Sequence, residues 1–503
     1  MEYCLDSVSM KQCDKFTIET IGIPSMVLME RAALTTATEI VSQTPIEQIH
    51  AVIFAGTGNN GGDGVAVGRI LYQWGADVVL ALVGDSSKYS TDMKQQLAIA
   101  QGLNIPLVNH NNLPAKEYNT VVDAIFGIGL SREVTGEFAL AIAQINQLGQ
   151  QARVYAVDIP SGIHTDTGEC LEIAVKAQVT VTFQYPKAGL YLQEGRECSG
   201  NVKVKDIGII KEPESAQVKA PYITFDKEDL SRLPKRSPQG HKGSFGRVAV
   251  YAGSYDMAGA AYFAADAAYR SGCGMVELIT HERNRTVLME KLPEAVFTCY
   301  ANEEEKSTDA PWKQAVNRAQ AVIIGPGLGT SDKAEEILSY VLQTAKVPCV
   351  IDADGINLLA HHKEWVQQCN APCILTPHIK ELSRLSDCTV DEVKKNYGEI
   401  AAQEAKKLGC VIVAKSHRSI VVTPQDTVRY LNLSGCDGMA TAGSGDVLAG
   451  IIGGLSAQGM NPFEAASLGV YIHGLAGEAA AEQYSNYSMK ASDIINNLYR
   501  YIK

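Results

Sequence analysis

The sequence lacks any apolar run of the roughly 20 residues that a membrane-spanning helix needs. It begins MEYCLDSVSMKQCDKF, where early acidic residues interrupt the apolar ones, so we expect no secretory signal peptide. A basic excess is also missing: the net charge is −12, whereas a nucleic-acid-binding surface needs a basic face to neutralise phosphates. We therefore expect neither a membrane nor a nucleic acid as partner.

Cysteine pairs are absent as well. The twelve cysteines are scattered, without CxxC pairs or Cys/His clusters at zinc-binding spacing, and Cys369 and Cys373 are the closest couple. We interpret the cysteines as reduced thiols that pack like small hydrophobic side chains, which predicts a cytoplasmic protein.

Two domains are predicted from the length of 503 residues and from the pattern of the chain. Short β-branched runs alternate with helix-period segments, which is typical of α/β folds with parallel sheets. Proline, glycine and charge are dense from about 211 to 246, so we assign 1–215 and 241–503 to separate domains with a linker at 216–240. The expected strands begin near His50, Asp77, Asn119, Arg153, Ala177 and Asn201 in the first half, and near Arg247, Met275, Ala319, Pro348, Pro372 and Cys410 in the second.

A glycine-rich turn, GTGNNGGDG at 56–64, follows the first expected strand and opens a helix. Its glycines let the backbone approach a ligand, and the helix N-terminus offers free amides to a phosphate, as in a Rossmann-like three-layer domain. Gly56, Gly58 and Gly61 satisfy GxGxxG, which keeps an NAD-dependent dehydrogenase as an alternative. Such an enzyme also needs an acidic residue at the end of the second strand to bind the ribose. The candidate here is Asp85, which comes late after that strand and is ambiguous.

Two further strands end in acidic residues beside glycine-rich loops. Asp123 lies in VVDAIFGIG, and Asp158 and Ser161 lie in VDIPSG. The carboxyl ends of parallel strands meet at one edge of a sheet, so we expect these side chains and Asn60 to share one crevice. Carboxylate, amide and hydroxyl oxygens suit a hard cation. Taken alone, either aspartate is equally well a turn or capping residue.

The elements GTGNNGGDGVAVGRIL, VVDAIFGIGL and VDIPSGI resemble the NAD(P)H-hydrate epimerases over roughly residues 1–215. The resemblance implies a substrate, NADH or NADPH hydrated at C6 of the nicotinamide ring, whose R and S forms are interconverted. It also implies a potassium ion held at Asn60, Asp123 and Ser161. Inversion at C6 breaks and remakes a carbon–oxygen bond, and we choose Asp158 as the catalytic acid/base. The implied substrate contacts are Asn59, Asn60, Gly61, Gly62, Asp63, Gly127, Ile128, Gly129, Leu130, Ser131, Arg132, Glu133 and Asp158.

The sharpest motif of the second half is GSGDVLAG at 443–450. Small residues open an apolar helix whose first amides can bind an anion, and Asp446 lies in its first turn. A general base beside a phosphoryl-binding site suits a hydroxyl that attacks a phosphate. No GxxxxGK[ST] is present, which argues against a P-loop enzyme. As an alternative, Asp446 is an ordinary first-turn acid.

Weaker elements follow the other expected strands, and each could be either a ligand contact or a plain turn. The partner of Lys415 could be either a nucleotide phosphate or a carboxylate. These elements are GPGLG at 325–329, Asp352 and Asp354 in DADG, His378 and Glu381 in TPHIKE, and Lys415 in VIVAKS.

The order of these elements resembles the ribokinase-like NAD(P)H-hydrate dehydratases over roughly 225–503, so the whole chain is similar to the bifunctional NAD(P)H-hydrate repair enzymes. The resemblance implies a ribokinase-like α/β domain with ADP or ATP as co-substrate and Mg²⁺ beside it. Asp446 would take the proton of the C6 hydroxyl, whose oxygen attacks the terminal phosphoryl group of the nucleotide. Phosphate would then leave from C6. The implied nucleotide contacts are Lys415, Ser416, His417, Arg418, Ser419, Gly443, Ser444 and Gly445, and the implied substrate contacts are Ala260, Gly327, His378 and Asp446.

One departure from that family is visible, because isoleucine and lysine follow His378 where proline and glycine are common. Two other functions compete with this interpretation. A ribokinase-like small-molecule kinase would have no use for the NNGGDG domain, and a merely nucleotide-binding first domain would not need Asn60, Asp123, Asp158 and Ser161 together. We expect a homo-oligomer that acts on hydrated NADH or NADPH and ADP.

Overall fold

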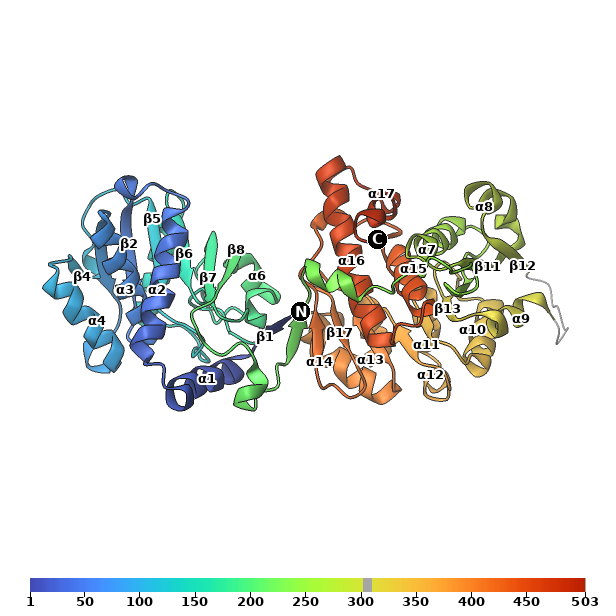
Figure 1. The fold of residues 1–503 in the computed structure, drawn as a ribbon, viewed down its shortest axis with the longest axis horizontal. Coiled ribbons are helices and arrows are strands. Elements are labelled where there is room, and N and C mark those ends of the chain that lie inside the picture. Colours follow the sequence, from blue (N-terminus) through green and yellow to red (C-terminus); the bar gives the residue numbers. More distant parts are fainter. Residues whose placement is uncertain (302–309, 503) are drawn as a thin grey trace. The chain divides into compact units, whose positions relative to one another are not determined.

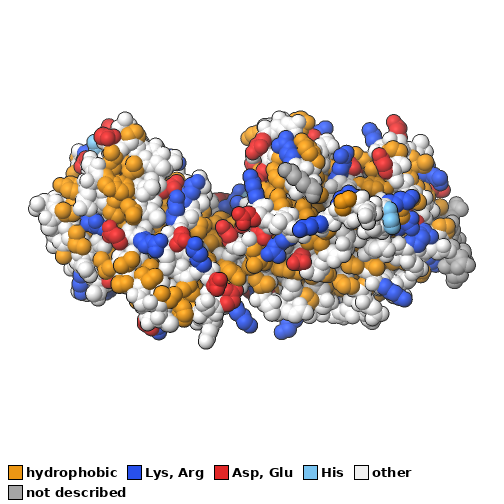
Figure 2. All heavy atoms as spheres, viewed as in Figure 1, with side chains coloured by type: hydrophobic (Ala, Val, Ile, Leu, Met, Phe, Trp, Pro, Cys, Tyr) orange, Lys and Arg blue, Asp and Glu red, His pale blue; other side chains and the backbone are white. Residues whose placement is uncertain are grey.

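The computed structural model describes residues 1–301 and 310–502. The chain forms two compact units, Glu2–Tyr222 and Ile223–Lys503, drawn as a ribbon in Figure 1. None of the described helices is both long and apolar enough to span a bilayer. On the face shown in Figure 2, acidic and basic side chains are interspersed, with no large basic patch.

The first unit is built on a parallel sheet with the strand order β4-β3-β2-β5-β6-β7-β8. Its strands are β2 (His50–Ala55), β3 (Asp77–Leu82), β4 (Leu107–Asn109), β5 (Thr120–Ala124), β6 (Arg153–Val157), β7 (Val179–Phe183) and β8 (Asn201–Lys205), and β1 (Glu2–Cys4) precedes them in the chain. Its helices are α1 (Ser7–Phe16), α2 (Ser25–Val41), α3 (Asn59–Trp74), α4 (Thr91–Gly102), α5 (Gly136–Leu148) and α6 (Gln193–Ser199).

Helices cover both faces of this sheet. On β2, Ile53 packs in one core cluster with residues of α2, α3 and α4, whereas Val52 and Phe54 pack in another with residues of α5. Figure 1 shows α2 and α3 side by side over one face. A strand buried on both faces needs a continuous apolar run, which is what β2 has. The predicted three-layer α/β fold of the first domain is confirmed.

Close backbone contacts explain the glycines of the turn before α3. A Cβ atom on Gly56 would lie 2.1 Å from the carbonyl oxygen of Ile125, and one on Gly61 would lie 2.0 Å from that of Gly56. Only glycine fits such positions. The turn is therefore pressed against the end of β5, and the first residues of α3 lie at the carboxyl edge of the sheet.

The second unit has a sheet with the order β18-β17-β16-β15-β14-β13-β10-β11-β12. Strands from β16 to β12 in this order are parallel, while β17 and β18 pair antiparallel. The strands are β10 (Arg247–Tyr251), β11 (Met275–His281), β12 (Val296–Tyr300), β13 (Ala321–Ile324), β14 (Cys349–Ile351), β15 (Cys373–Leu375), β16 (Val411–Ala414), β17 (Ile420–Val422) and β18 (Arg429–Leu431), and β9 (Tyr222–Thr224) lies where the two units join in the chain. The longer helices are α7 (Ala258–Arg270), α10 (Asp332–Thr344), α13 (Ile379–Ser386), α14 (Val390–Leu408), α15 (Ser444–Ala457) and α16 (Pro462–Tyr484), and the shorter ones are α8 (Arg285–Lys291), α9 (Pro311–Arg318), α11 (Asp354–Leu359), α12 (Glu364–Gln367) and α17 (Ala491–Asn497).

Helix α15 is buried along almost its whole length between α7 and α16 (Figure 1). Glycines make this possible, because a Cβ atom on Gly450 would lie 2.4 Å from the carbonyl oxygen of Ala264 in α7. A Cβ atom on Gly453 would lie 2.4 Å from the side chain of Ile323 in β13. Helix and sheet thus fix the N-terminus of α15, with Asp446 in its first turn.

Candidate active sites

A cavity of about 620 Å³ opens at the carboxyl edge of the first unit's sheet. Residues of α1, α2 and α3 line it, together with the segments that follow β5 and β6. Of the residues predicted to contact substrate, the lining includes Asn59, Asn60, Asp63, Gly127, Ile128, Gly129, Leu130, Ser131, Arg132 and Asp158. Gly61 and Gly62 are buried within α3, and Glu133 lines a neighbouring hollow that Arg132 also borders.

Asp123 is fully buried at the end of β5 and is tied to Ser161. The Ser161 hydroxyl donates to Asp123 Oδ1 at 2.6 Å, and the Ser161 amide donates to Oδ2 at 2.7 Å. The amide of Phe126 donates to Ser161 Oγ at 2.8 Å, and the next residue, Gly127, lies against Asn60. Burial raises the pKa of Asp123 to about 6, although hydrogen bonds from Ser161 and Ile125 oppose the shift. The three residues predicted to hold a cation come from α3, the end of β5 and the segment after β6, and each of them lies against the loop at 125–127.

Asp158 forms an ion pair that the sequence did not reveal. Lys187 Nζ lies 2.6 Å from Asp158 Oδ1, and the lysine side chain is 0% exposed. Asp158 has φ of +68°, a conformation that residues other than glycine rarely adopt. No motif marks Lys187 in QYPKAG; its only signal is that it follows a strand expected to end at the same edge of the sheet.

Further charged side chains border the cavity among apolar ones. Asp14 from α1, Asp92 from α4 and Asp63 from α3 line it with Asp158, and Lys11 and Arg132 supply positive charge. Burial, and then the charge of Asp158, raises the pKa of Asp63 well above its usual value. Burial and the same neighbour also raise the pKa of Asp14. Sequence reasoning missed Asp14 and Asp92, because they come from helices without a recognisable motif.

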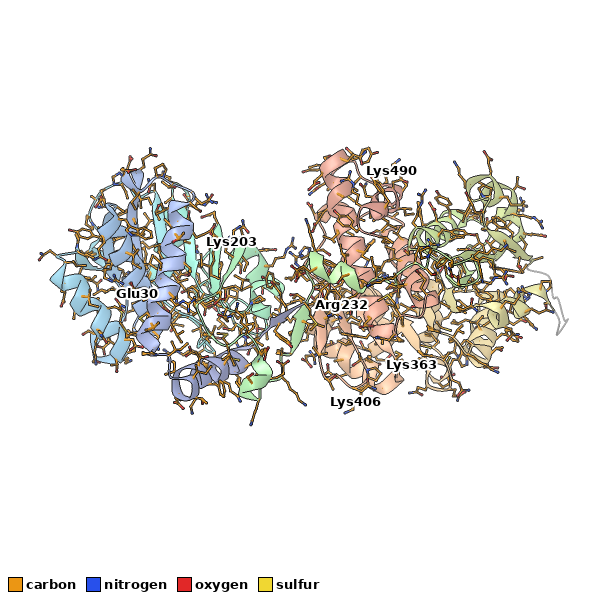
Figure 3. All side chains as sticks on the ribbon, viewed as in Figure 1. Glu30, Lys203, Arg232, Lys363, Lys406 and Lys490 are labelled. Atoms are coloured by element: carbon orange, nitrogen blue, oxygen red, sulfur yellow. The ribbon has the colours of Figure 1, made fainter. Side chains whose placement is uncertain are left out.

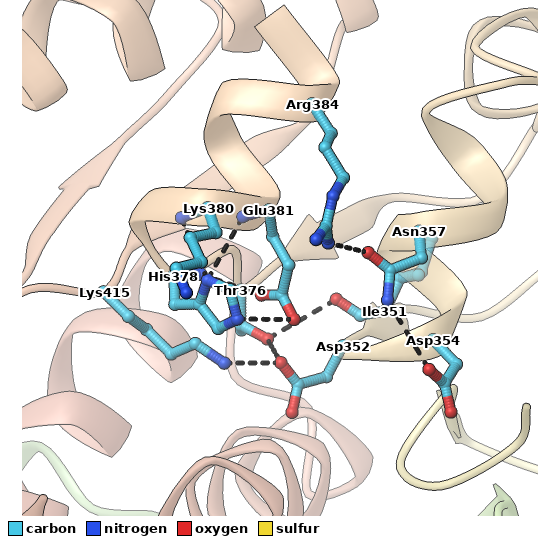
Figure 4. Close-up of polar contacts among 10 residues, drawn as sticks. All are labelled: Ile351, Asp352, Asp354, Asn357, Thr376, His378, Lys380, Glu381, Arg384 and Lys415. Atoms are coloured by element: carbon cyan, nitrogen blue, oxygen red, sulfur yellow. Dashed lines mark hydrogen bonds and ion pairs between the residues drawn. The ribbon is translucent and has the colours of Figure 1, made fainter. Parts of the chain in front are cut away.

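In the second unit, the ends of three neighbouring strands meet in a polar cluster (Figure 4). Lys415 Nζ, after β16, lies 2.6 Å from Asp352 Oδ1, after β14. Thr376, after β15, donates its hydroxyl to the same oxygen at 2.7 Å. Burial alone would lower the pKa of Lys415, but the charges of Asp352 and Glu381 raise it above its usual value. Lys415 thus has a carboxylate partner within the protein, and its predicted contact with a nucleotide phosphate stays a prediction.

His378 caps the N-terminus of α13. Its Nδ1 accepts the backbone amides of Lys380 and Glu381, each at 3.1 Å, and its own amide donates to Glu381 Oε2 at 2.8 Å. Burial, and then the charge of Lys415, lowers the pKa of His378, whereas burial raises the pKa of Glu381 to about 7. The TPHIKE segment therefore forms a capped helix start beside the ion pair, without the proline and glycine common in the family.

The GSGD turn passes directly beside that ion pair. A Cβ atom on Gly445 would lie 3.3 Å from Lys415 Nζ and 3.7 Å from Asp352 Oδ2. Burial, and then the charge of Asp352, raises the pKa of Asp446 to about 7. Gly443 has φ of +88° and leaves no room for a side chain, because its Cβ atom would lie 2.6 Å from Phe263.

The remaining predicted contacts of the second unit fall into two groups. Gly327 lies against Ala260, because a Cβ atom on the glycine would lie 2.9 Å from that of the alanine, and the amide of Gly329 donates to Asp354 Oδ2 at 2.8 Å. Among the residues after Lys415, Ser416 and His417 are exposed, Ser419 is partly exposed, and Arg418 donates to the carbonyl of Leu433. Ser444 is buried, with its hydroxyl 3.3 Å from His473 Nε2.

Comparisons with known proteins agree over the whole chain. The model of a family described as NAD(P)H-hydrate dehydratase matches residues 248–500, and the model of the YjeF-related protein N-terminus matches residues 25–189. A bifunctional NAD(P)H-hydrate repair enzyme from Moorella thermoacetica is 36% identical over 511 residues, covering 99% of this chain and 96% of that protein. The protein of the same name from Escherichia coli is 31% identical over 489 residues, covering 96% and 91%.

A solved structure supports the fold of the second unit. The ribokinase-like superfamily protein from Enterococcus faecalis is 30% identical, with a TM-score of 0.50, and the match covers 56% of this chain and 95% of that one. The predicted ribokinase-like fold is confirmed. Because both halves match NAD(P)H-hydrate repair proteins, the two alternative functions, a ribokinase-like small-molecule kinase fused to a nucleotide-binding domain and an NAD-dependent dehydrogenase, are no longer supported.

The buried pair of Lys415 and Asp352 makes a prediction about stability. Lys415→Met would leave the carboxylate of Asp352, which is 1% exposed, without a counter-charge, and should lower the free energy of unfolding by about 3–5 kcal/mol. Lys363, labelled in Figure 3, is the matched control: it pairs with the exposed Asp387, so Lys363→Met should cost less than about 1 kcal/mol. Urea unfolding of the two variants measures the difference, and equal losses would contradict the importance of the buried pair.

Proposed function

The chain belongs to the family of bifunctional NAD(P)H-hydrate repair enzymes, which epimerise hydrated NAD(P)H and dehydrate it, and we propose how its two sites divide this chemistry. The epimerase domain spans 1–215, the dehydratase domain spans 241–503, and 216–240 lead from one to the other. All twelve cysteines are free thiols, which supports a reducing cytoplasm. We also propose a homo-oligomer.

In the first site, Asp158 is the proposed acid/base. The ring nitrogen N1 can expel the hydroxyl group from C6, and water can return to the other face of the ring. The departing oxygen needs a proton and the returning water must lose one, which a single carboxylate can shuttle. The observation that carries this assignment is the position of Asp158, which lines the same cavity as residues of the two predicted substrate segments, Asn59–Asp63 and Gly127–Glu133.

The fully buried carboxylate of Asp123 supports the proposed potassium site. It has hydroxyl and amide donors but no cationic partner among the described residues, and such a carboxylate fits a hard cation of low charge. Asn60, Asp123 and Ser161 would hold the ion. Potassium would neutralise Asp123 and steady the loop that carries Phe126 and Gly127 beside the substrate.

In the second site, Asp446 is the proposed general base. Its carboxyl group lies in the first turn of α15, beside amides that can stabilise charge on a phosphoryl group. It removes the proton of the C6 hydroxyl, whose oxygen attacks the terminal phosphorus of ADP or ATP and displaces AMP or ADP by breaking the phosphoanhydride bond. The N1 lone pair then expels phosphate from C6, which leaves with the electrons of the C–O bond, and loss of the C5 proton to water restores the dihydropyridine ring of NAD(P)H.

Several residues are proposed to position the reactants for this transfer. Lys415, Ser416, His417, Arg418 and Ser419 would border the nucleotide with Gly443, Ser444 and Gly445, and Ala260, Gly327 and His378 would border the substrate. Support comes from the approach of Gly445 to Lys415 and of Gly327 to Ala260. Among the described residues no group of three or more His, Cys, Asp or Glu is arranged to hold a metal. We propose that Mg²⁺ binds together with the nucleotide phosphates, where it would supply charge neutralisation, and that Asp352 and Asp446 would offer it hard oxygens.

The proposed dehydration is tested by the near-ultraviolet absorbance that returns when NADH forms from its hydrate. We expect recovery only with ADP or ATP present, and a rate that rises from pH 6 to pH 8, because a base with a pKa of about 7 must lose its proton. Asp446→Asn should slow dehydration by roughly 10²–10⁴-fold and leave epimerisation unchanged. Equal recovery without nucleotide would contradict the mechanism, and a loss below about tenfold would make Asp446 structural.

The proposed epimerase roles separate in a second experiment, a time course on a mixture of R and S forms with ADP. Asp158→Asn should give two phases, a fast one for the S form and a slow one for the R form. Asp123→Asn should also slow the second phase, but extra potassium should partly restore it, because this variant weakens ion binding rather than proton transfer. A single fast phase for Asp158→Asn would disprove its assignment.

A further inference from the structure

The ammonium group of Lys187 is completely enclosed by three acceptors. Its Nζ donates to Asp158 Oδ1 at 2.6 Å, to Thr182 Oγ1 at 2.9 Å and to the carbonyl oxygen of Phe183 at 2.9 Å. An ammonium has three N–H bonds, so all of them are used. Lys187 therefore has no proton left to donate to a substrate in the neighbouring cavity.

The hydrogen bonds of Asp158 all fall on one of its two oxygens. Oδ1 accepts from Lys187, from the Thr182 hydroxyl at 3.0 Å and from the Phe183 amide at 3.4 Å. Within the described part of the chain, Oδ2 accepts no hydrogen bond. Both residues lie at the cavity wall, but the aspartate side chain is 13% exposed and the lysine side chain 0%, so Oδ2 is the oxygen available to substrate.

We propose that Lys187 is a positioning residue of the epimerase reaction, which fixes the Asp158 carboxylate through Oδ1 and leaves Oδ2 to exchange the proton with the C6 hydroxyl. The inference rests on the proposed role of Asp158. The argument is geometric: a charge-assisted hydrogen bond from the ammonium holds one carboxylate oxygen in place, so that the other keeps a fixed direction toward the cavity. The three bonds to Oδ1 also hold a backbone whose φ is strained at +68°.

A purely structural role is the competing interpretation. Lys187 forms a β-bridge with Leu5, and the Leu5 amide donates to the carbonyl of Pro186, so this segment also anchors the N-terminal part of the unit. These contacts are made by the backbone, which a side-chain substitution retains. The two interpretations therefore differ in whether losing the ammonium changes kcat through Asp158.

Lys187→Met tests the proposal in the full-length enzyme with hydrated NADH and ADP. We expect kcat of epimerisation to fall about 10²-fold, KM to change less than about threefold, and dehydration of the S form to stay at the unmodified rate. Lys205→Met is the matched control, because Lys205 also pairs with a largely buried acid of the same unit, Glu39, at 2.8 Å. It should leave epimerisation unchanged. If the Lys187→Met variant epimerises its substrate at the rate of the unmodified enzyme, the proposal is wrong.

A double variant asks whether Lys187 acts through Asp158. If it does, adding Lys187→Met to Asp158→Asn should slow epimerisation by less than about twofold further. A double variant whose rate loss equals the product of the two single losses would overturn the inference. An unmodified rate for Asp158→Asn alone would instead disprove the proposed function of Asp158, so the two failures are distinguishable.

Chemical rescue covers the case in which Lys187→Met does not fold. Lys187→Ala lacks only the three outer carbons and the nitrogen, which n-propylammonium can replace. We expect n-propylammonium to restore epimerisation at least about tenfold, and 1-propanol, which has the same shape without the charge, to restore nothing. Equal effects of the amine and the alcohol would overturn the proposal.

Discussion

The parallel direction of the strands is the constraint on which both sites depend. Parallel strands bring all their carboxyl ends to one edge of a sheet, so residues far apart in the chain become neighbours there. Asp123 and Ser161 are 38 positions apart and share two hydrogen bonds, and Asp352 and Lys415 are 63 positions apart and form an ion pair. Helices on both faces bury the strands, and the loops at this edge are left to bind ligands.

The two sites share an electrostatic arrangement. Each contains an aspartate–lysine ion pair with one buried partner, Lys187 in its pair with Asp158 and Asp352 in its pair with Lys415. Each also contains a carboxyl group whose pKa is raised by burial, Asp63 in the first site and Asp446 in the second. Environments that separate the pKa values of neighbouring acids are typical of acid–base catalysis. In the first site the proposed catalytic group is the ion-paired carboxylate, Asp158. In the second site it is the carboxyl group with the raised pKa, Asp446.

The sequence predicted the features that arise from local pattern. The strands that end at Asp123, Asp158 and Asp352 were expected from apolar runs followed by an acid, and the helix after GSGD was expected from small residues before an apolar stretch. Features that depend on the order of strands were not predictable. β14 and β16 flank β15 in the sheet, so the long side chain of Lys415 can reach Asp352 across the end of β15. The partner of Asp158 is a lysine without any motif. The short strands β4, β12, β17 and β18 were also missed, and the last two pair antiparallel.

The central claim is that two separate sites carry two separate proton-transfer groups, and a mixing experiment tests it most directly. The R form of hydrated NADH is incubated with ADP and either Asp158→Asn, Asp446→Asn or an equimolar mixture of the two variants. Each variant alone should form NADH only slowly, because the first cannot invert the substrate and the second cannot dehydrate it. The mixture should form NADH rapidly, because the S form released by one variant is consumed by the other. A mixture no faster than the sum of its components would contradict the account.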